Sequence, residues 1–227
     1  MALSIVSTKD ASEDHGIKAL IYGKAGAGKT SLAKTAPNPI ILSAESGILS
    51  LRDVELPMIK IETVDDLSEA HEWLESSDDA KQFQTVFIDS ISEIGETVLA
   101  NAKRQVKDPR QAYGELIEKM TMLIRAFRDL SGFHVVMLAK QEPTKDEMTG
   151  VVLYGPSMPG AKLGNQLPYL FDEVFRLGIG KTQDGTLYRF FQTQPDFQYE
   201  AKDRSGVLDA MEMPDLTHIF NKINGRV

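Results

Sequence analysis

The sequence predicts an α/β fold in which a mostly parallel, twisted sheet is flanked by helices and carries a C-terminal antiparallel hairpin. Short apolar runs typical of buried strands alternate along the chain with segments of helical spacing, which is the pattern of a parallel core. A glycine-rich loop lies between the first strand-like run and the next helical segment. Residues 171–178 and 187–193 have the composition of strands and are joined through Gln183-Asp184-Gly185, which favours a hairpin.

Each expected element follows from local composition. Buried strands are expected where short apolar runs occur, at 17–22, 40–42, 57–61, 85–89 and 134–139. Helices are expected at 29–36, 65–74, 90–107, 112–130, 163–170 and 215–223. Prolines set two boundaries, because Pro37 stops the first helix and Asp108-Pro109 separates the two longest helices. Residues 141–160 hold six glycines and prolines and are expected to form a long loop, which in a compact domain usually carries function.

Size and composition are those of a globular protein with an ordinary core. The 227 residues are 42% hydrophobic and 26% charged, which is enough for one well-packed domain. The absence of cysteine excludes disulfides, thiolate zinc sites and cysteine nucleophiles. The longest apolar runs, such as 135–139, are too short to span a bilayer, and the first residues lack a basic leader. We therefore expect a cytoplasmic protein with no membrane partner.

Charge and organisation limit the choice of partners. The net charge of −8 is unfavourable for a protein that coats nucleic acid by electrostatics alone, so any such contact needs a local cationic strip. Residues 1–16 are expected to form a polar N-terminal extension whose apolar patch, Leu3–Val6, is a candidate oligomerisation segment. Residues 17–227 are expected to form a single domain.

The glycine-rich loop carries the strongest functional signal. Residues 23–30 match G-x-x-x-x-G-K-[ST], the phosphate-binding P-loop, between a strand and a helix. Its glycines let main-chain N–H groups turn toward a polyphosphate, at the positive end of the helix. Lys29 is placed to reach the β- and γ-phosphates, and the Thr30 hydroxyl to bind Mg²⁺. The residues expected to bind nucleotide are Gly23, Lys24, Ala25, Gly26, Ala27, Gly28, Lys29, Thr30 and Ser31.

Polar residues at strand ends supply the rest of a candidate ATP·Mg²⁺ site. Asp89 ends a buried strand, where it can hold magnesium, although an aspartate there can also cap the next helix. Glu45 follows the strand after the P-loop helix and is the candidate base for the attacking water. Glu93, one helical turn beyond Asp89, is its rival. Gln141 follows the strand 134–139 and is a candidate sensor of the γ-phosphate.

The order of these segments resembles the RecA-type ATPase core, and most of all the small phage-encoded AAA-type ATPases that include single-strand annealing recombinases. The resemblance rests on residues 23–30, 41–47, 86–90, 137–141, 159–163, 171–174, 192–195 and 201–206. It covers nearly the whole chain, about residues 17–210. It implies a RecA-like fold, ATP and Mg²⁺ as cofactors, host cytoplasm as the location, and a catalytic role for Lys29, Glu45 and Gln141.

The resemblance also implies two DNA-binding segments. The first lies near residues 101–113 and contains the densest cationic cluster of the chain, Lys103, Arg104, Lys107 and Arg110. These side chains could neutralise phosphates, although a solvated helix face has the same pattern. The second is the expected loop 142–160, where Lys145 could contact phosphate and Met148 could pack against bases or against its own loop.

RecA-like ATPases act as rings or filaments with nucleotide between subunits, so the resemblance implies self-assembly. Lys202 and Arg204 are the candidate cations for a neighbour's γ-phosphate, although a salt-bridged turn is the alternative. The predicted function is an ATP-dependent recombinase or annealing protein on single-stranded DNA, with a single-strand-binding protein as a possible partner. Two alternatives remain open, a DNA-binding module that uses ATP only as an assembly switch, and a small-molecule phosphotransferase, which the absence of arginine in 141–160 disfavours.

Overall fold

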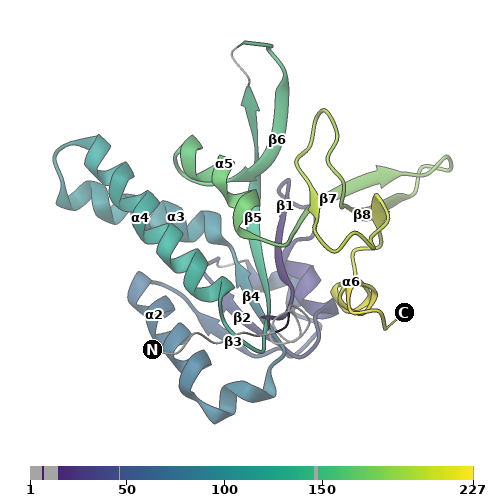
Figure 1. Ribbon diagram of the computed structural model, residues 1–227, viewed down its shortest axis with the longest axis horizontal. Coiled ribbons are helices and arrows are strands. Elements are labelled where there is room, and N and C mark those ends of the chain that lie inside the picture. The colour runs from purple at the N-terminus through teal and green to yellow at the C-terminus, as the bar shows by residue number, and fades with distance from the viewer. Residues whose placement is uncertain (1–6, 8–14, 46, 146–147, 227) are drawn as a thin grey trace.

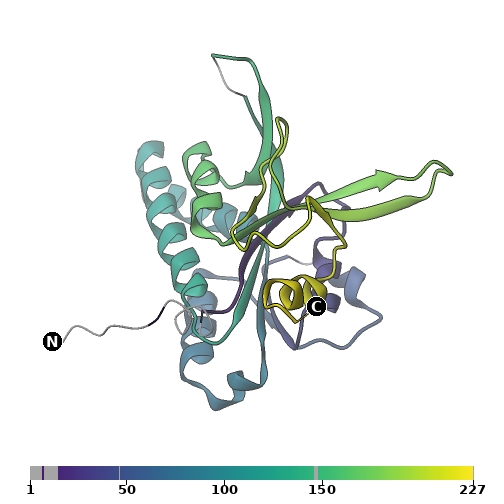
Figure 2. The same cartoon turned by 45° about the vertical axis from the view of Figure 1, so that its right-hand side comes forward.

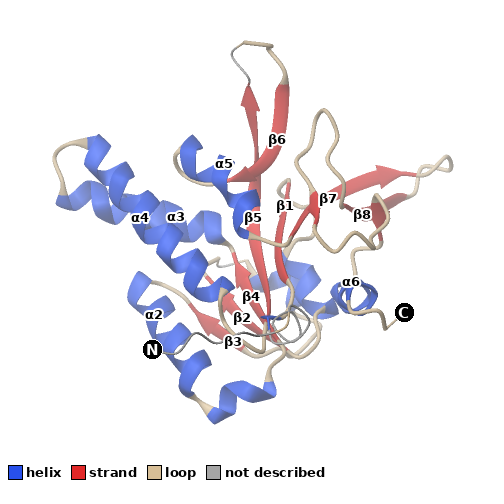
Figure 3. Cartoon of the chain, viewed as in Figure 1, coloured by secondary structure: helices blue, strands red, loops and turns tan. Residues whose placement is uncertain are grey.

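We describe the fold from a computed structural model, in which residues 7, 15–45, 47–145 and 148–226 are described. Their strands form one sheet in the order β10-β8-β7-β1-β5-β4-β2-β3, with β6 paired to β5 and β9 paired to β7. Figure 1 shows this sheet with helices packed on both faces, and Figure 3 separates its strands from the helices by colour. The expected α/β class, with a mostly parallel sheet, is confirmed.

The parallel part of the sheet forms the centre of the molecule. Its strands are β1 (Lys18–Gly23), β2 (Pro39–Ser43), β3 (Met58–Lys60), β4 (Thr85–Asp89), β5 (His134–Lys145) and β7 (Glu173–Lys181). β5 lies between β1 and β4, so the strand before the P-loop and the strand that ends in Asp89 are not neighbours. Both nevertheless end at the same edge, because their strands are parallel.

Helices cover the two faces unequally. One face packs against α2 (Val64–Ser76), α3 (Ile91–Gln105), α4 (Pro109–Arg128) and α5 (Ala161–Leu170). The other packs against the 3₁₀ helix η1 (Thr30–Thr35) and α6 (Leu216–Ile223). Alternation along β4 shows how the strands serve both cores, since Val86 and Ile88 face the first cluster and Phe87 the second. No helix among the described residues combines the length and apolar character needed to cross a bilayer.

Two expected helices differ in detail from the prediction. The segment after the P-loop is helical but forms the 3₁₀ helix η1, and Ala36 ends it directly before Pro37. The helix expected at 112–130 begins earlier, at Pro109, because Asp108 caps it by accepting a hydrogen bond from the main-chain N–H of Arg110. The break between the two longest helices is where the sequence predicts it.

The prediction of a long loop at 141–160 is wrong. β5 continues to Lys145 and pairs antiparallel with β6 (Val152–Ser157), so most of this segment is a β-hairpin. Pro143 is tolerated within it, because it lies on a two-stranded arm rather than in the middle of the sheet. Figure 1 shows the β5–β6 hairpin rising beyond the ends of the other parallel strands.

The C-terminal hairpin is present, and its first strand begins and ends later than expected. β7 pairs with β8 (Leu187–Gln192) in antiparallel register from Arg176 to Lys181, and the turn contains Gly185 with a φ of 92°. Two short strands, β9 (Lys202–Asp203) and β10 (Met211–Glu212), extend the sheet beside it. Figure 2 shows the β7–β8 hairpin projecting away from the helical layers.

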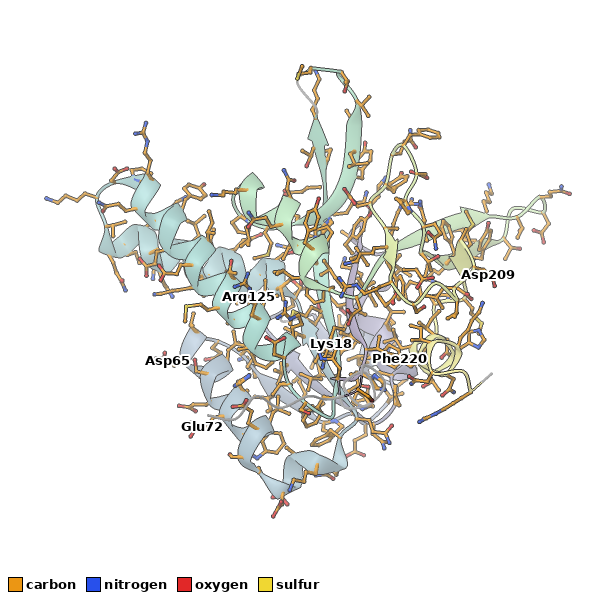
Figure 4. The ribbon with its side chains drawn as sticks, viewed as in Figure 1. Lys18, Asp65, Glu72, Arg125, Asp209 and Phe220 are labelled. Carbon is orange, nitrogen blue, oxygen red and sulfur yellow. The ribbon has the colours of Figure 1, made fainter. Side chains whose placement is uncertain are left out.

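A buried lysine, Lys18, is the first residue of β1, at the opposite end of this strand from the P-loop. Lys18 is fully buried, and its Nζ donates to the carbonyls of Leu130 and Phe133, each at 2.8 Å. Figure 4 shows Lys18 at the centre of the molecule. Burial lowers the pKa of this ammonium to about 8, and the two carbonyls compensate part of its lost hydration. The candidate extension 1–16 lies outside the described residues except for Ser7, His15 and Gly16.

Candidate nucleotide site

The P-loop begins with the last residue of β1, at the carboxyl edge of the parallel strands. Two of its glycines have φ angles that other residues rarely adopt, 76° at Gly26 and 100° at Gly28. The Lys29 ammonium folds back onto the loop and donates to the carbonyls of Gly23 at 3.0 Å and Lys24 at 3.3 Å. Burial lowers its pKa. A phosphate would offer this cation a stronger, charged partner than these two carbonyls.

Thr30 and Asp89 meet beside the P-loop. The Thr30 hydroxyl donates to Asp89 Oδ2 at 2.6 Å, although 59 residues separate them in sequence. The Asp89 carboxyl is only 2% exposed, and this burial raises its pKa to about 6 against the lowering effect of the Thr30 hydrogen bond. A buried carboxylate beside a hydroxyl suits Mg²⁺, which prefers few protein oxygens together with water and phosphate. Within the described part of the chain, no three acidic or histidine side chains form a metal site of their own.

The two candidate bases have different surroundings. The Glu45 carboxylate accepts a hydrogen bond from the Ser90 hydroxyl at 2.7 Å, and its charge acts on both Asp89 and Lys29. The Glu93 carboxylate instead accepts from Lys140 Nζ at 2.9 Å. A base that is ion-paired is less free to take a proton, so the geometry favours Glu45 for this role. The role itself stays a prediction.

Gln141 lies where the sheet becomes the β5–β6 hairpin. Its neighbour Lys140 pairs in register with Gly23, the first residue of the P-loop, and Gln141 itself pairs with Pro156. Lys140 binds both Glu93 and Glu96, which raises the pKa of its ammonium. Gln141 is therefore next to the nucleotide site in sequence and register, and its sensing role stays a prediction.

Lys202 and Arg204 lie away from the P-loop. Register places Lys202 beside Val174, which is level with Leu20 in the middle of β1. Its ammonium donates to the carbonyls of Pro168 and Phe171, and burial lowers its pKa. Arg204 binds the Asp172 carboxylate at 2.6 Å. Both cations would have to leave these partners to reach a neighbouring subunit's nucleotide, and that role stays a prediction.

The candidate DNA-binding residues are on the surface. Lys103, Arg104, Lys107 and Arg110 are exposed at the turn between α3 and α4, which we call the cationic turn. The Lys103 ammonium lies 5.4 Å from the centre of the Tyr113 ring. At the β5–β6 hairpin, Lys145 is exposed and Met148 is 97% exposed. Figure 1 shows the cationic turn at the left of the molecule and the β5–β6 hairpin at its top.

Three side chains that make contacts around the site were missed by sequence reasoning. The Tyr22 hydroxyl donates to the main-chain carbonyls of Tyr154 and Glu200, which ties the strand before the P-loop to β6. The Ser90 hydroxyl holds Glu45. Arg189 Nε donates to a P-loop carbonyl, that of Ala27, at 2.7 Å. The partners lie between 45 and 178 residues apart, so no local sequence pattern could identify them.

Comparison with known proteins identifies one family over most of the chain. A family model described as an AAA domain matches residues 15–205, which include the P-loop, Glu45, Asp89 and Gln141. A search of curated proteins finds no match to the chain.

Proposed function

The chain belongs to the AAA-domain family of P-loop ATPases, and from this premise we propose that it hydrolyses ATP to control its hold on single-stranded DNA. The observation that carries the ATPase part is the contact between Thr30 and Asp89 at 2.6 Å, beside Lys29 and within electrostatic reach of Glu45. The residues that we assign to phosphate, to magnesium and to the base are thus together at one edge of the sheet. That edge is where open α/β sheets bind their ligands.

The residues have distinct tasks in this proposal. The P-loop amides and Lys29 hold the phosphates, and Thr30 and Asp89 would hold Mg²⁺, which would neutralise charge on the phosphate oxygens. Glu45 takes a proton from the attacking water while the water oxygen bonds to the γ-phosphorus. The bond from that phosphorus to the bridging oxygen then breaks, and ADP leaves with the electron pair. The Ser90 hydroxyl orients the Glu45 carboxylate toward this water.

The surface supports single-stranded DNA as the partner. The cationic turn supplies a local cluster of positive charge in a chain whose net charge is −8. Contacts between such side chains and phosphates position a DNA strand without reading its sequence. The β5–β6 hairpin adds exposed apolar residues, Met148, Val151 and Val152, that can pack against bases. We propose that copies of the chain assemble on the strand as a ring or filament and promote annealing, with a single-strand-binding protein as a further partner.

Glu45→Gln tests the hydrolytic step against a matched control, Glu93→Gln. Loss of a general base typically slows reaction by about 10²- to 10⁴-fold, so phosphate release by Glu45→Gln should fall in this range. Its affinity for a fluorescent ATP analogue should stay near that of the wild type, whereas Lys29→Ala should lose nucleotide binding. The assignment of Glu45 is wrong if Glu93→Gln is the slower variant, or if Glu45→Gln retains full turnover.

The DNA part is tested with an alanine pair in the cationic turn, Lys103→Ala and Lys107→Ala combined. The control is Lys81→Ala on the 3₁₀ helix η3 (Asp78–Gln82), which is exposed and separate from the turn. Oligonucleotide anisotropy should give a salt dependence shallower by about 1.4 in log–log slope, since each lost phosphate contact on a single strand removes about 0.7. An unchanged slope would rule out this turn as a DNA-binding segment.

ATP-driven assembly of the protein without ATP hydrolysis would favour the alternative in which ATP acts only as an assembly switch.

A further inference from the structure

Arg189 reaches the P-loop from a strand that no nucleotide motif includes. It lies on β8, and its Nε donates to the carbonyl of Ala27 at 2.7 Å, across 162 residues of sequence. The side chain is directed there by alternation along the strand. The rings of its neighbours Tyr188 and Phe190 occupy the space that a Cβ would fill at Gly180 and Gly178 on β7. Arg189, between them, projects from the opposite face of the hairpin.

The guanidinium lies directly against the P-loop backbone. A Cβ added at Gly28 would be 2.9 Å from Arg189 Nε, which is closer than ordinary van der Waals contact, and 3.4 Å from its Cδ. The absence of a side chain at Gly28 therefore serves two purposes. It permits the φ of 100°, and it leaves room for the arginine beside the loop.

Most of the hydrogen-bonding capacity of Arg189 remains available. A guanidinium has five N–H donors, and the hydrogen bond to Ala27 uses the one on Nε. Within the described part of the chain, Arg189 forms no salt bridge with an acidic side chain. Its two terminal amino groups are therefore positioned at the loop as a second cation, in addition to Lys29. Arginine binds phosphate well because its planar donors match pairs of phosphate oxygens.

We propose that Arg189 is a nucleotide-binding residue acting within its own subunit. Its Nε stays on the Ala27 carbonyl while its terminal amino groups donate to phosphate oxygens of the bound nucleoside triphosphate. The inference rests on the proposed function, since it requires that the P-loop binds nucleotide. It also gives the β7–β8 hairpin a direct connection to the occupied site.

The test compares Arg189→Ala and Arg189→Lys with Lys181→Ala, an exposed cation on the same hairpin. Affinities for ATP and for inorganic tripolyphosphate are measured by calorimetry with Mg²⁺. Loss of a hydrogen bond to a charged group corresponds to about 10- to 100-fold weaker binding, which we expect for Arg189→Ala with both ligands. Arg189→Lys should recover part of the affinity, because it keeps the charge, and Lys181→Ala should match the wild type.

The outcomes separate this inference from the proposed function. A wild-type protein that binds neither ligand would contradict the proposed function. A wild-type protein that binds ATP, together with equal or tighter binding by Arg189→Ala, would overturn the inference alone. Weaker binding of ATP with unchanged binding of tripolyphosphate would also overturn it, because the contact would then be to the ribose or base. Should Arg189→Ala fail to fold, as judged by circular dichroism, Arg189→Gln replaces it in the same comparison.

Discussion

Glu173→Gln should make the stability of the protein less sensitive to pH. Glu173 is the first residue of β7 and is only 2% exposed. One carboxyl oxygen accepts from the main-chain N–H of Ser205 at 3.2 Å, and the other has no partner when the group is ionised. Burial, followed by the nearby charge of Asp203, raises the pKa of Glu173 to about 8. The folded protein therefore keeps a proton on this carboxyl at neutral pH.

The neighbouring acid explains why Glu173 takes the proton. Asp203 is already an acceptor for three donors, the Ser205 hydroxyl and the main-chain N–H groups of Gly206 and Leu208. These donors engage both carboxyl oxygens of Asp203. A proton on Glu173 can bridge to Asp203, and the pair then carries one negative charge in a buried position instead of two.

The size and sign of the effect follow from the two pKa values. The unfolded chain releases the Glu173 proton near pH 4.5 and the folded chain near pH 8, so between these values the folded state holds more protons. Stability therefore falls as pH rises through this window. At pH 7 the difference of 2.5 pH units from 4.5 corresponds to about 3 kcal/mol. Glutamine resembles the protonated acid and cannot ionise, so the variant should lose this dependence.

Urea denaturation followed by circular dichroism, at several values between pH 5 and pH 8, measures the prediction. The free energy of unfolding of Glu173→Gln, relative to the wild type, should increase by about 3 kcal/mol across this range. Glu118→Gln, an exposed position on α4, is the control and should give a nearly constant difference. Parallel pH curves for the wild type and Glu173→Gln would refute the reasoning, because the buried carboxyl would then be ionised in both states or in neither.

Three further predictions concern the connections around the site. Tyr22→Phe removes a hydroxyl that donates to two main-chain carbonyls and should cost about 1–3 kcal/mol in urea denaturation, with a loss below about 0.5 kcal/mol arguing against both bonds. Ser92→Ala removes a hydroxyl that donates to one strand of the β5–β6 hairpin and accepts from the other. It should speed amide exchange in that hairpin before the rest of the sheet. His134 accepts a main-chain N–H, and burial lowers its pKa from 6.5 to about 4, so acidification from pH 7 to pH 4 should cost about 3 kcal/mol of stability. A His134→Asn variant, which cannot take up the proton, should lose this part of the acid sensitivity.

The parts of the molecule that sequence could predict depend on local patterns. The P-loop is eight consecutive residues, and Asp89 follows a run of strand-forming residues, so both could be placed without knowing the fold. Their contact, Thr30 with Asp89, follows from the general rule that parallel strands end at one edge. Strand order could not be read in this way. That β5 separates β1 from β4 depends on packing between distant segments.

The wrong prediction of a loop at 141–160 has a specific cause. Glycine and proline usually mark turns, and this segment has six of them. Where β5 extends beyond its neighbours in the sheet it pairs only with β6, and a two-stranded arm of this kind tolerates proline. The β-branched pair Val151-Val152 and the aromatic Tyr154 favour a strand. A strand forms at Val152–Ser157 although this range contains Gly155 and Pro156. The same hairpin keeps its place because Ser92 on α3 bonds to both of its strands.

A physical connection between the nucleotide and the β5–β6 hairpin follows from these contacts. β5 is at once the neighbour of the strand before the P-loop, the strand that carries Gln141, and the first strand of the hairpin. The Tyr22 hydroxyl binds β6 from the residue directly before the P-loop. A displacement of the P-loop on binding phosphate would therefore reach the hairpin through two short paths, one along β5 and one through Tyr22. Both paths join residues more than 100 positions apart in sequence, so they exist only in the folded protein.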